Sequence, residues 1–219
     1  MRSDSLMLYS YWRSTTSYRV RAALNIKGVP YDIVPVDLVA GDQMAPDYGA
    51  LNPGHGVPTL VIGGETVLTQ SLAILDYIEA TWPTPPLLPE DPLVRARVLA
   101  AAHTMALDVH PVNNLRVVTH LRHAYGADTD AAMDWMRHWM HQGFTAFETL
   151  VRDDTLFAFG AAPDMADLCL VAQAYNARRW GVDLAPFPNI ARIEAACLAH
   201  PAIAAAHPDQ QPDAQAPPP

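Results

Sequence analysis

Three short polar segments of the chain carry side chains suited to holding a thiol and a small peptide. Residues 13–17 (Arg-Ser-Thr-Thr-Ser) place hydroxyls ahead of an apolar helical pattern, where free N–H groups and the helix dipole stabilise an anion such as a thiolate. Pro58 precedes an apolar strand pattern, and a cis bond after Val57 would turn the Val57 backbone outward to pair with a peptide. Gln70 and Ser71 open another helix with an amide, a hydroxyl and a second N-terminus suited to a carboxylate.

The elements that must position these segments follow a βαβ and then a ββα order. Gly28 stands where a left-handed residue ends the first helix, and Gly63 with Gly64 is typical of a two-residue hairpin turn. The expected strands cover 6–12, 31–36, 59–62 and 66–68, and the expected helices run from 14–17 to about 27 and from 70 to 82. This order predicts a compact α/β domain over 7–82.

A proline-rich connector predicts the domain boundary. Five prolines between 81 and 92 cannot continue a helix and stiffen the chain, so we expect a linker over 83–92. The rest lacks strand patterns and has amphipathic stretches over 93–125, 129–152, 164–180 and 188–198, which predict an all-α domain over 93–206. Residues 1–6 are expected to be a disordered leader, and 207–219, rich in Pro, Gln, Asp and Ala, a disordered tail without function.

Composition excludes several classes of partner. The 219 residues carry a net charge of -9, so there is no diffuse positive field to hold nucleic acid or an anionic bilayer. No apolar run is long enough to span a membrane or to form a signal peptide, so we expect a cytoplasmic protein. Cys169 and Cys197 lie in apolar helical patterns and are expected to be reduced core residues.

Two histidine pairs have a spacing that could chelate a metal ion. These pairs are His120 with His123 and His138 with His141. No carboxylate pattern accompanies either pair, so we expect no metal site.

In this order, the three segments resemble those of the glutathione transferases, and within them the zeta class, from Met7 to about Leu198. Residues 14–21 (Ser-Thr-Thr-Ser-Tyr-Arg-Val-Arg) match the class motif Ser-Ser-Cys-Ser-x-Arg-Val-Arg, and 51–53, 57–58 and 68–71 match closely. Residues 110–116 and 178–188 look like second-domain signatures of bacterial maleylacetoacetate and maleylpyruvate isomerases. The resemblance implies the glutathione transferase fold: a thioredoxin-like α/β N-terminal domain followed by an all-α C-terminal domain.

The resemblance also implies glutathione as the cofactor and assigns residues to it. Ser14 is expected to be the main hydroxyl donor to the glutathione sulfur, with Thr16 as a second candidate and Arg13 beside them. The expected glutathione contacts are Ser14, Thr16, His55, Val57, Pro58, Gln70, Ser71, His110 and Asn114.

The implied reaction is the cis–trans isomerisation of a maleyl keto acid, maleylacetoacetate to fumarylacetoacetate, in aromatic catabolism. Its substrate has two carboxylates, which arginine forks bind bidentately. We therefore expect Arg13, Arg116 and Arg179 to bind substrate, with Arg178 as the alternative to Arg179. Three other functions stay open: maleylpyruvate isomerisation, a transferase or dehalogenase acting on α-halo acids, and a glutathione-binding module without turnover. A homodimer is implied by the resemblance alone.

Two residues depart from the pattern of the class. Thr16 stands where the class usually keeps a cysteine, which argues against thiol-disulfide chemistry such as dehydroascorbate reduction but leaves isomerisation intact. Asp164 stands where relatives carry Thr or Ser as a helix cap. Because Asp also caps helices, we expect that helix to form.

Overall fold

The computed structural model describes residues 5–215 and divides into two compact units. One unit contains the chain up to Pro86 together with the segment from His200 onward, and the other contains Leu87–Ala199. The division falls inside the expected connector. Residues 1–4 of the expected leader and 216–219 of the expected tail lie outside the described residues.

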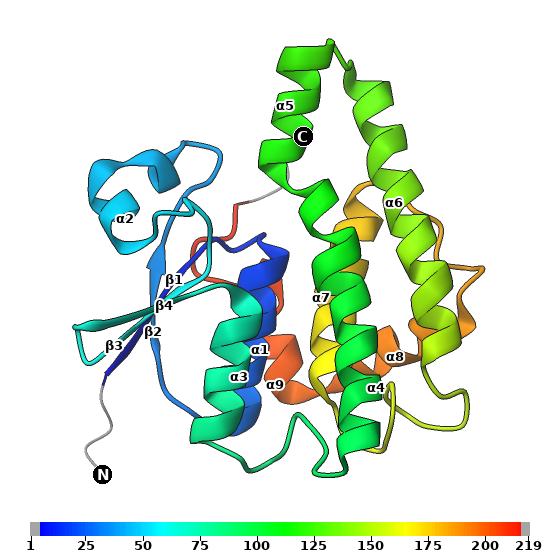
Figure 1. Cartoon of the computed structure of the whole chain (residues 1–219). Helices are drawn as coiled ribbons and strands as arrows, with labels where there is room; N and C mark the ends of the chain where they lie inside the picture. Colours follow the sequence, from blue (N-terminus) through cyan, green and yellow to red (C-terminus); the bar gives the residue numbers. More distant parts are fainter. Residues whose placement is uncertain (1–4, 216–219) are drawn as a thin grey trace. The chain divides into compact units, whose positions relative to one another are not determined.

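The first unit is built on a four-stranded mixed sheet with the order β2-β1-β3-β4 (Figure 1). Its strands are β1 (Leu6–Ser10), β2 (Asp32–Pro35), β3 (Thr59–Ile62) and β4 (Thr66–Thr69). The central strand β1 runs parallel to β2 and antiparallel to β3, with Leu8 opposite both Ile33 and Leu60. Gly63 and Gly64 both have positive φ, as the predicted hairpin turn requires. Leu6, the last residue of the expected leader and the first of the expected strand, is the first residue of β1.

Two helices, α1 (Thr15–Lys27) and α3 (Ser71–Thr81), pack together on one face of this sheet (Figure 1). Leu24 of α1 and Ile74 of α3 are fully buried, each contributing about 2 kcal/mol of hydrophobic stabilisation. Gly28 ends α1 in the left-handed conformation (φ 65), as predicted. The link from β2 to β3 contains the short helices η1 (Asp42–Met44) and α2 (Pro46–Leu51).

The C-terminal segment differs from its prediction, because it folds onto the first unit. Helix α9 (Pro201–Ala205) packs against α1, and a 3-10 turn η4 (Pro208–Gln210) follows it. Gln211 is buried and its Nε2 donates to the carbonyl oxygens of Ala205 and His207, at 3.1 and 2.9 Å. Composition predicted disorder here, but these polar side chains find local hydrogen-bond partners that composition does not reveal.

The second unit is helical, as predicted. Its helices are α4 (Pro92–His103), the π-helix η2 (Thr104–Val109), the 3-10 turn η3 (Pro111–Asn113), α5 (Leu115–Tyr125), α6 (Thr129–Leu150), α7 (Met165–Arg179) and α8 (Pro188–Ala199). Helix α7 is the core of the unit: it is buried along most of its length and packs against α4 and α8.

The amphipathic stretch 93–125 is interrupted, which the pattern did not indicate. A π-helical segment follows α4, and Pro111, which lacks a backbone N–H, begins a separate 3-10 turn. Asn114 then caps α5, its side chain accepting from the N–H of Arg116 at 3.1 Å.

A buried pair of carboxyl groups starts α7. Asp164 Oδ1 accepts from the N–H of Ala166 at 2.8 Å, and Asp167 Oδ2 accepts from the N–H of Asp164 at 2.7 Å, which completes a capping box. Burial raises the pKa of Asp164 to about 6. Burial and the nearby Asp164 carboxyl raise the pKa of Asp167 well above its usual range. Asp164 therefore caps the helix as expected, but at the cost of a buried acid pair.

Candidate functional site

The start of α1 presents its hydroxyls on a tight turn. The N–H of Ser14 donates to the carbonyl of Tyr11 at 3.0 Å, which closes the turn that leads out of β1. Ser14 is the N-cap of α1, and its Oγ accepts from the N–H of Ser17 at 3.2 Å. The turn therefore fixes Ser14 at the positive end of the helix dipole.

The two candidate hydroxyls are linked in one hydrogen-bonded chain. Thr16 Oγ1 donates to the carbonyl of Val57 at 2.7 Å, and Ser14 Oγ lies 2.8 Å from Thr16 Oγ1. A hydroxyl has a single proton, and that of Thr16 is given to Val57. Ser14 is consequently the donor to Thr16, and its proton is the one of the two that is not given to the protein backbone.

The loop that carries Val57 is fixed by a buried polar cluster that sequence reasoning did not select. Tyr48 Oη donates to the carbonyl of Gly56 at 2.5 Å, and Asn52 Nδ2 donates to the same oxygen at 2.8 Å. Asn52 Nδ2 also donates to Thr59 Oγ1 at 3.0 Å. Burial raises the pKa of Tyr48, which keeps its phenol protonated as a donor. Adjacent carbonyls of the loop, at 56 and 57, are thus held by side chains from two elements.

Val57 and Pro58 are joined by a cis peptide bond, the condition considered from the sequence. His55, in contrast, is exposed, and its Nδ1 lies 2.8 Å from the carbonyl oxygen of Gln43. The backbone of His55 has a positive φ of 49°. The imidazole is thus engaged with the η1 segment.

Helix α3 begins at Gln70 in a conformation that side chains rarely adopt, with φ 70 and ψ 115. The Gln70 side chain does not cap the helix, so it leaves the first-turn N–H groups to other acceptors. Ser71 Oγ accepts from Nη1 of the buried Arg19 at 3.3 Å, which brings positive charge from α1 to this helix start. The arrangement favours an anionic group, and binding of a carboxylate here stays a prediction.

Arg13 lies over aromatic rings beside the hydroxyl chain. Its guanidinium carbon is 5.1 Å from the Trp12 ring centroid and 5.9 Å from that of Tyr11, and its Nη2 donates to Tyr11 Oη at 3.4 Å. Among residues 5–215 no carboxylate forms an ion pair with Arg13. The aromatic rings therefore hold the Arg13 guanidinium as a half-exposed cation beside Ser14 in the chain.

In the second unit the predicted residues of the 110–116 segment lie around the helix break. His110 follows the π-helix, a feature frequent at functional sites, and its N–H donates to the carbonyl of Met105 at 3.1 Å. The Asn114 side chain caps α5 by accepting from the backbone N–H of Arg116, and the Arg116 side chain is exposed. Asn113, the last residue of η3, is buried, whereas Asn114 is the half-buried N-cap of α5.

The structure distinguishes the two arginines that end α7. Arg178 forms a fork with Glu194, with Nε donating to Oε1 at 2.8 Å and Nη2 to Oε2 at 2.5 Å. Glu194 is nearly buried, so this pair is part of the packing between α7 and α8. Arg179 instead lies 5.7 Å from the Trp180 ring centroid and is exposed. Arg179 Nη1 also donates to Asn176 Oδ1 at 3.2 Å, and its guanidinium is not part of the fork that Arg178 forms with Glu194.

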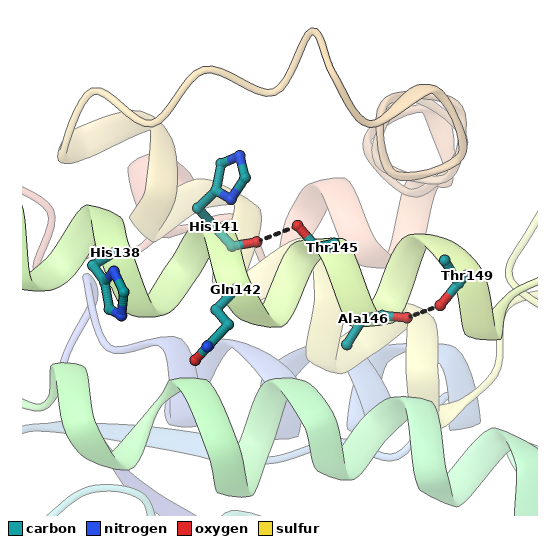
Figure 2. Close-up of a pocket in the computed structure, with 6 residues that line it drawn as sticks. All are labelled: His138, His141, Gln142, Thr145, Ala146 and Thr149. Atoms are coloured by element: carbon teal, nitrogen blue, oxygen red, sulfur yellow. Dashed lines mark hydrogen bonds between the residues drawn. The ribbon is translucent and has the colours of Figure 1, made fainter.

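A surface hollow of about 550 Å³ lies along α6 and contains none of the predicted site residues (Figure 2). Its hydroxyls are used within the helix: Thr145 Oγ1 donates to the carbonyl of His141 and Thr149 Oγ1 to that of Ala146, both at 2.8 Å. His138 and His141 point to opposite sides of the helix and do not converge on an ion (Figure 2). In the part of the chain described, no group of three His, Cys, Asp or Glu side chains could hold a metal.

The fold and the site define a class of protein. Residues 13–81 match the family model described as glutathione S-transferase, N-terminal domain, which is the segment that carries Ser14, Thr16 and Ser71. The fold class expected from the sequence, a thioredoxin-like domain followed by helices, is confirmed by solved structures of this class.

Individual relatives indicate the class of glutathione transferases to which this chain is similar. A maleylacetoacetate isomerase from Rhizobium meliloti (strain 1021) is 46% identical over 95% of this chain and 98% of its own length. The holo structure of a bacterial zeta-class maleylpyruvate isomerase has a TM-score of 0.93 and 43% identity, over 95% of this chain and all (100%) of that one. A maleylacetoacetate isomerase from Methylobacterium extorquens AM1, solved with bound malonate and glutathione, has a TM-score of 0.92 and 42% identity. The match covers 96% of this chain and 100% of that one. The chain belongs to the family of maleylacetoacetate and maleylpyruvate isomerases in the zeta class of glutathione transferases.

Proposed function

We propose that this chain catalyses the glutathione-dependent cis–trans isomerisation of a maleyl keto acid, with maleylacetoacetate as the substrate and maleylpyruvate as the alternative. The observation that carries the proposal is the hydroxyl chain from Ser14 through Thr16 to Val57 at the start of α1. That chain leaves one orientable O–H at a helix N-terminus, which is the donor a thiolate requires.

The residues of the first unit fit glutathione. The hydroxyl of Ser14 suits its sulfur, the backbone of Val57 suits its peptide groups, and the start of α3 at Gln70 and Ser71 suits a carboxylate. When bound, glutathione supplies a thiolate whose reversible addition turns the cis double bond of the substrate into a single bond that can rotate.

The side chains of the protein have two tasks in this reaction. Ser14 donates its proton toward the sulfur and so lowers the pKa of the thiol, which is near 8.5 when free. The dipole of α1 acts in the same direction. Arg13, with a guanidinium held over aromatic rings, binds a carboxylate of the diacid.

The proposal assigns the remaining carboxylate contacts to Arg116 and Arg179 in the second unit, and further glutathione contacts to His55, His110 and Asn114. Arg179 takes precedence over Arg178 because the fork of Arg178 is already occupied by Glu194. The bound malonate, a dicarboxylate, of the Methylobacterium extorquens relative supports a diacid substrate.

The rival functions make different demands on the site. A transferase or dehalogenase acting on α-halo acids would use the same hydroxyls but would need only one carboxylate contact. A module without turnover would bind glutathione without lowering the pKa of its thiol. Homodimer formation and a cytoplasmic location remain predictions. In the described residues no helix is long and apolar enough to cross a bilayer.

The direct test is an assay of the purified protein with maleylacetoacetate and with maleylpyruvate, with and without glutathione. We expect isomerisation only with glutathione, no turnover with S-methylglutathione, and no effect of metal chelators. Equal turnover in the absence of any thiol would overturn the proposal. Turnover of α-halo acids with no isomerisation would favour the dehalogenase.

A further inference from the structure

The C-terminal segment covers the outer side of α1. Asn25 Nδ2 donates to the carbonyl of Ala202 at 3.0 Å, and the Tyr18 and His207 rings meet edge to face with centroids 5.8 Å apart. Pro208 is buried beyond them. The chain therefore continues in contact with the first unit until it reaches the turn that precedes Ser14.

At that turn the C-terminal segment makes a direct polar contact. Asp213 Oδ2 accepts from the backbone N–H of Trp12 at 3.0 Å, across 201 positions of the sequence. Trp12 lies beyond the end of β1, so its N–H has no place in the hydrogen-bond ladder of the sheet. A carboxylate acceptor makes this a charge-assisted bond, which is stronger than a neutral one.

The backbone carbonyl of Trp12 is held by a buried arginine, Arg21. Arg21 Nη2 donates to the carbonyl of Trp12 at 3.0 Å, and Arg21 Nε donates to the carbonyl of Ala206 at 3.2 Å. The N–H and the carbonyl of Trp12 are thus both held, one by Asp213 and one by Arg21. The next two residues of the chain are Arg13 and Ser14.

We propose that Asp213 is a positioning residue for the reaction, which acts through the Trp12 backbone to fix the orientation of Arg13 and Ser14. The inference rests on the proposed function of those two residues. Without the acceptor, the N–H end of the peptide group between Tyr11 and Trp12 has no partner, and only its carbonyl end, which accepts from the N–H of Ser14 at 3.0 Å and from Arg21 Nη1 at 3.4 Å, still holds the peptide plane. Tilting of that plane shifts the Trp12 ring over which Arg13 stacks and, through the Tyr11 carbonyl, the backbone of Ser14.

The test compares three full-length variants. Asp213→Ala removes the acceptor, Asp213→Asn keeps a carbonyl acceptor without the charge, and Asp209→Ala removes the same charge from a carboxylate whose side chain is 62% exposed. We expect kcat/KM for the maleyl keto acid to fall about tenfold in Asp213→Ala, with a raised pKa of the bound glutathione thiol. Asp213→Asn is expected to stay within about threefold of the parent protein, and Asp209→Ala to match it.

Two results would overturn the inference: Asp213→Ala behaving like Asp209→Ala, or Asp213→Asn losing as much as Asp213→Ala. Hydrogen exchange of the Trp12 amide gives a readout that does not depend on any variant folding. This amide should be protected in the parent protein, and exchange as fast as in an open turn would contradict the contact. Absence of isomerisation by the parent protein would instead contradict the proposed function, and the exchange result would still test the contact between Asp213 and Trp12.

Discussion

Replacing Thr16 with valine separates two roles that this hydroxyl could have at the glutathione sulfur. The chain of hydrogen bonds makes Ser14 the donor and Thr16 an acceptor that competes with the sulfur for the Ser14 proton, because the Thr16 proton is given to Val57. In that arrangement Thr16 acts only through Ser14. If Thr16 instead donated to the sulfur itself, its effect would be independent of Ser14.

The size of each effect follows from the bonds involved. A hydroxyl bonded to a charged acceptor contributes about 1.5–3 kcal/mol, so Ser14→Ala should raise the pKa of the bound thiol by about 1–2 units. Thr16→Val removes this competing acceptor, while the N–H of Ser17 still holds Ser14 Oγ. A neutral hydrogen bond contributes about 0.5–1.5 kcal/mol, so Thr16→Val should lower the pKa of the bound thiol by about half a unit to one unit.

The assay is the ultraviolet absorbance of the thiolate, titrated with glutathione bound to the parent protein, each single variant and the double variant. We expect the double variant to titrate like Ser14→Ala, since Thr16 has no proton to compete for once the Ser14 hydroxyl is gone. Thr16→Ser keeps both hydrogen bonds and serves as the matched control, with an unchanged titration. Additive increases from the two substitutions would refute this reasoning and make Thr16 a second donor.

Two further predictions concern the second unit and the substrate. Arg→Met at Arg13, Arg116 or Arg179 should raise KM for the diacid and lower kcat/KM by about 2–4 kcal/mol, with little change for an uncharged electrophile. Arg122→Met on the same helix as Arg116 is the control, and equal losses on both substrates would assign the arginine to folding instead. Because the pKa of Asp164 is raised to about 6 in the folded state, the stability it contributes is present below the unfolded value of 3.8 and is lost as pH rises through about 6. Asp164→Ser, which keeps a cap, should therefore raise the unfolding free energy by about 1–3 kcal/mol at pH 8 and much less at pH 4, and equal shifts at both would contradict the buried acid pair.

The order of elements could be predicted because local signals determine it. Gly28 ends α1 and the glycines at 63 and 64 form the hairpin turn, since each adopts a positive φ that other residues rarely reach. Ser14 caps α1 because its side chain reaches the N–H three residues on. Each of these features depends on a few neighbouring residues, so a single sequence contains the information.

Contacts between distant parts of the chain could not be predicted in the same way. The polar cluster of Tyr48, Asn52 and Thr59 depends on the path of the loop, although Asn-Pro followed by Gly was a signal that a shaped turn lies there. Choosing Arg179 over Arg178 required the position of Glu194 on another helix. The hydrogen bond from Trp12 to Asp213 joins residues 201 positions apart, and composition near Asp213 indicated only disorder.

Thr16 stands where the motif of the class has a cysteine, and this difference connects these observations. A threonine hydroxyl donates to the Val57 carbonyl at 2.7 Å, whereas a thiol is a weak donor with a longer bond. The threonine therefore adds a firm link between the start of α1 and the loop to which our proposal assigns the cofactor peptide. It also removes the thiol that thiol-disulfide chemistry would use. This one difference thus favours a reaction in which the sulfur of the cofactor is the only thiol that acts as a nucleophile.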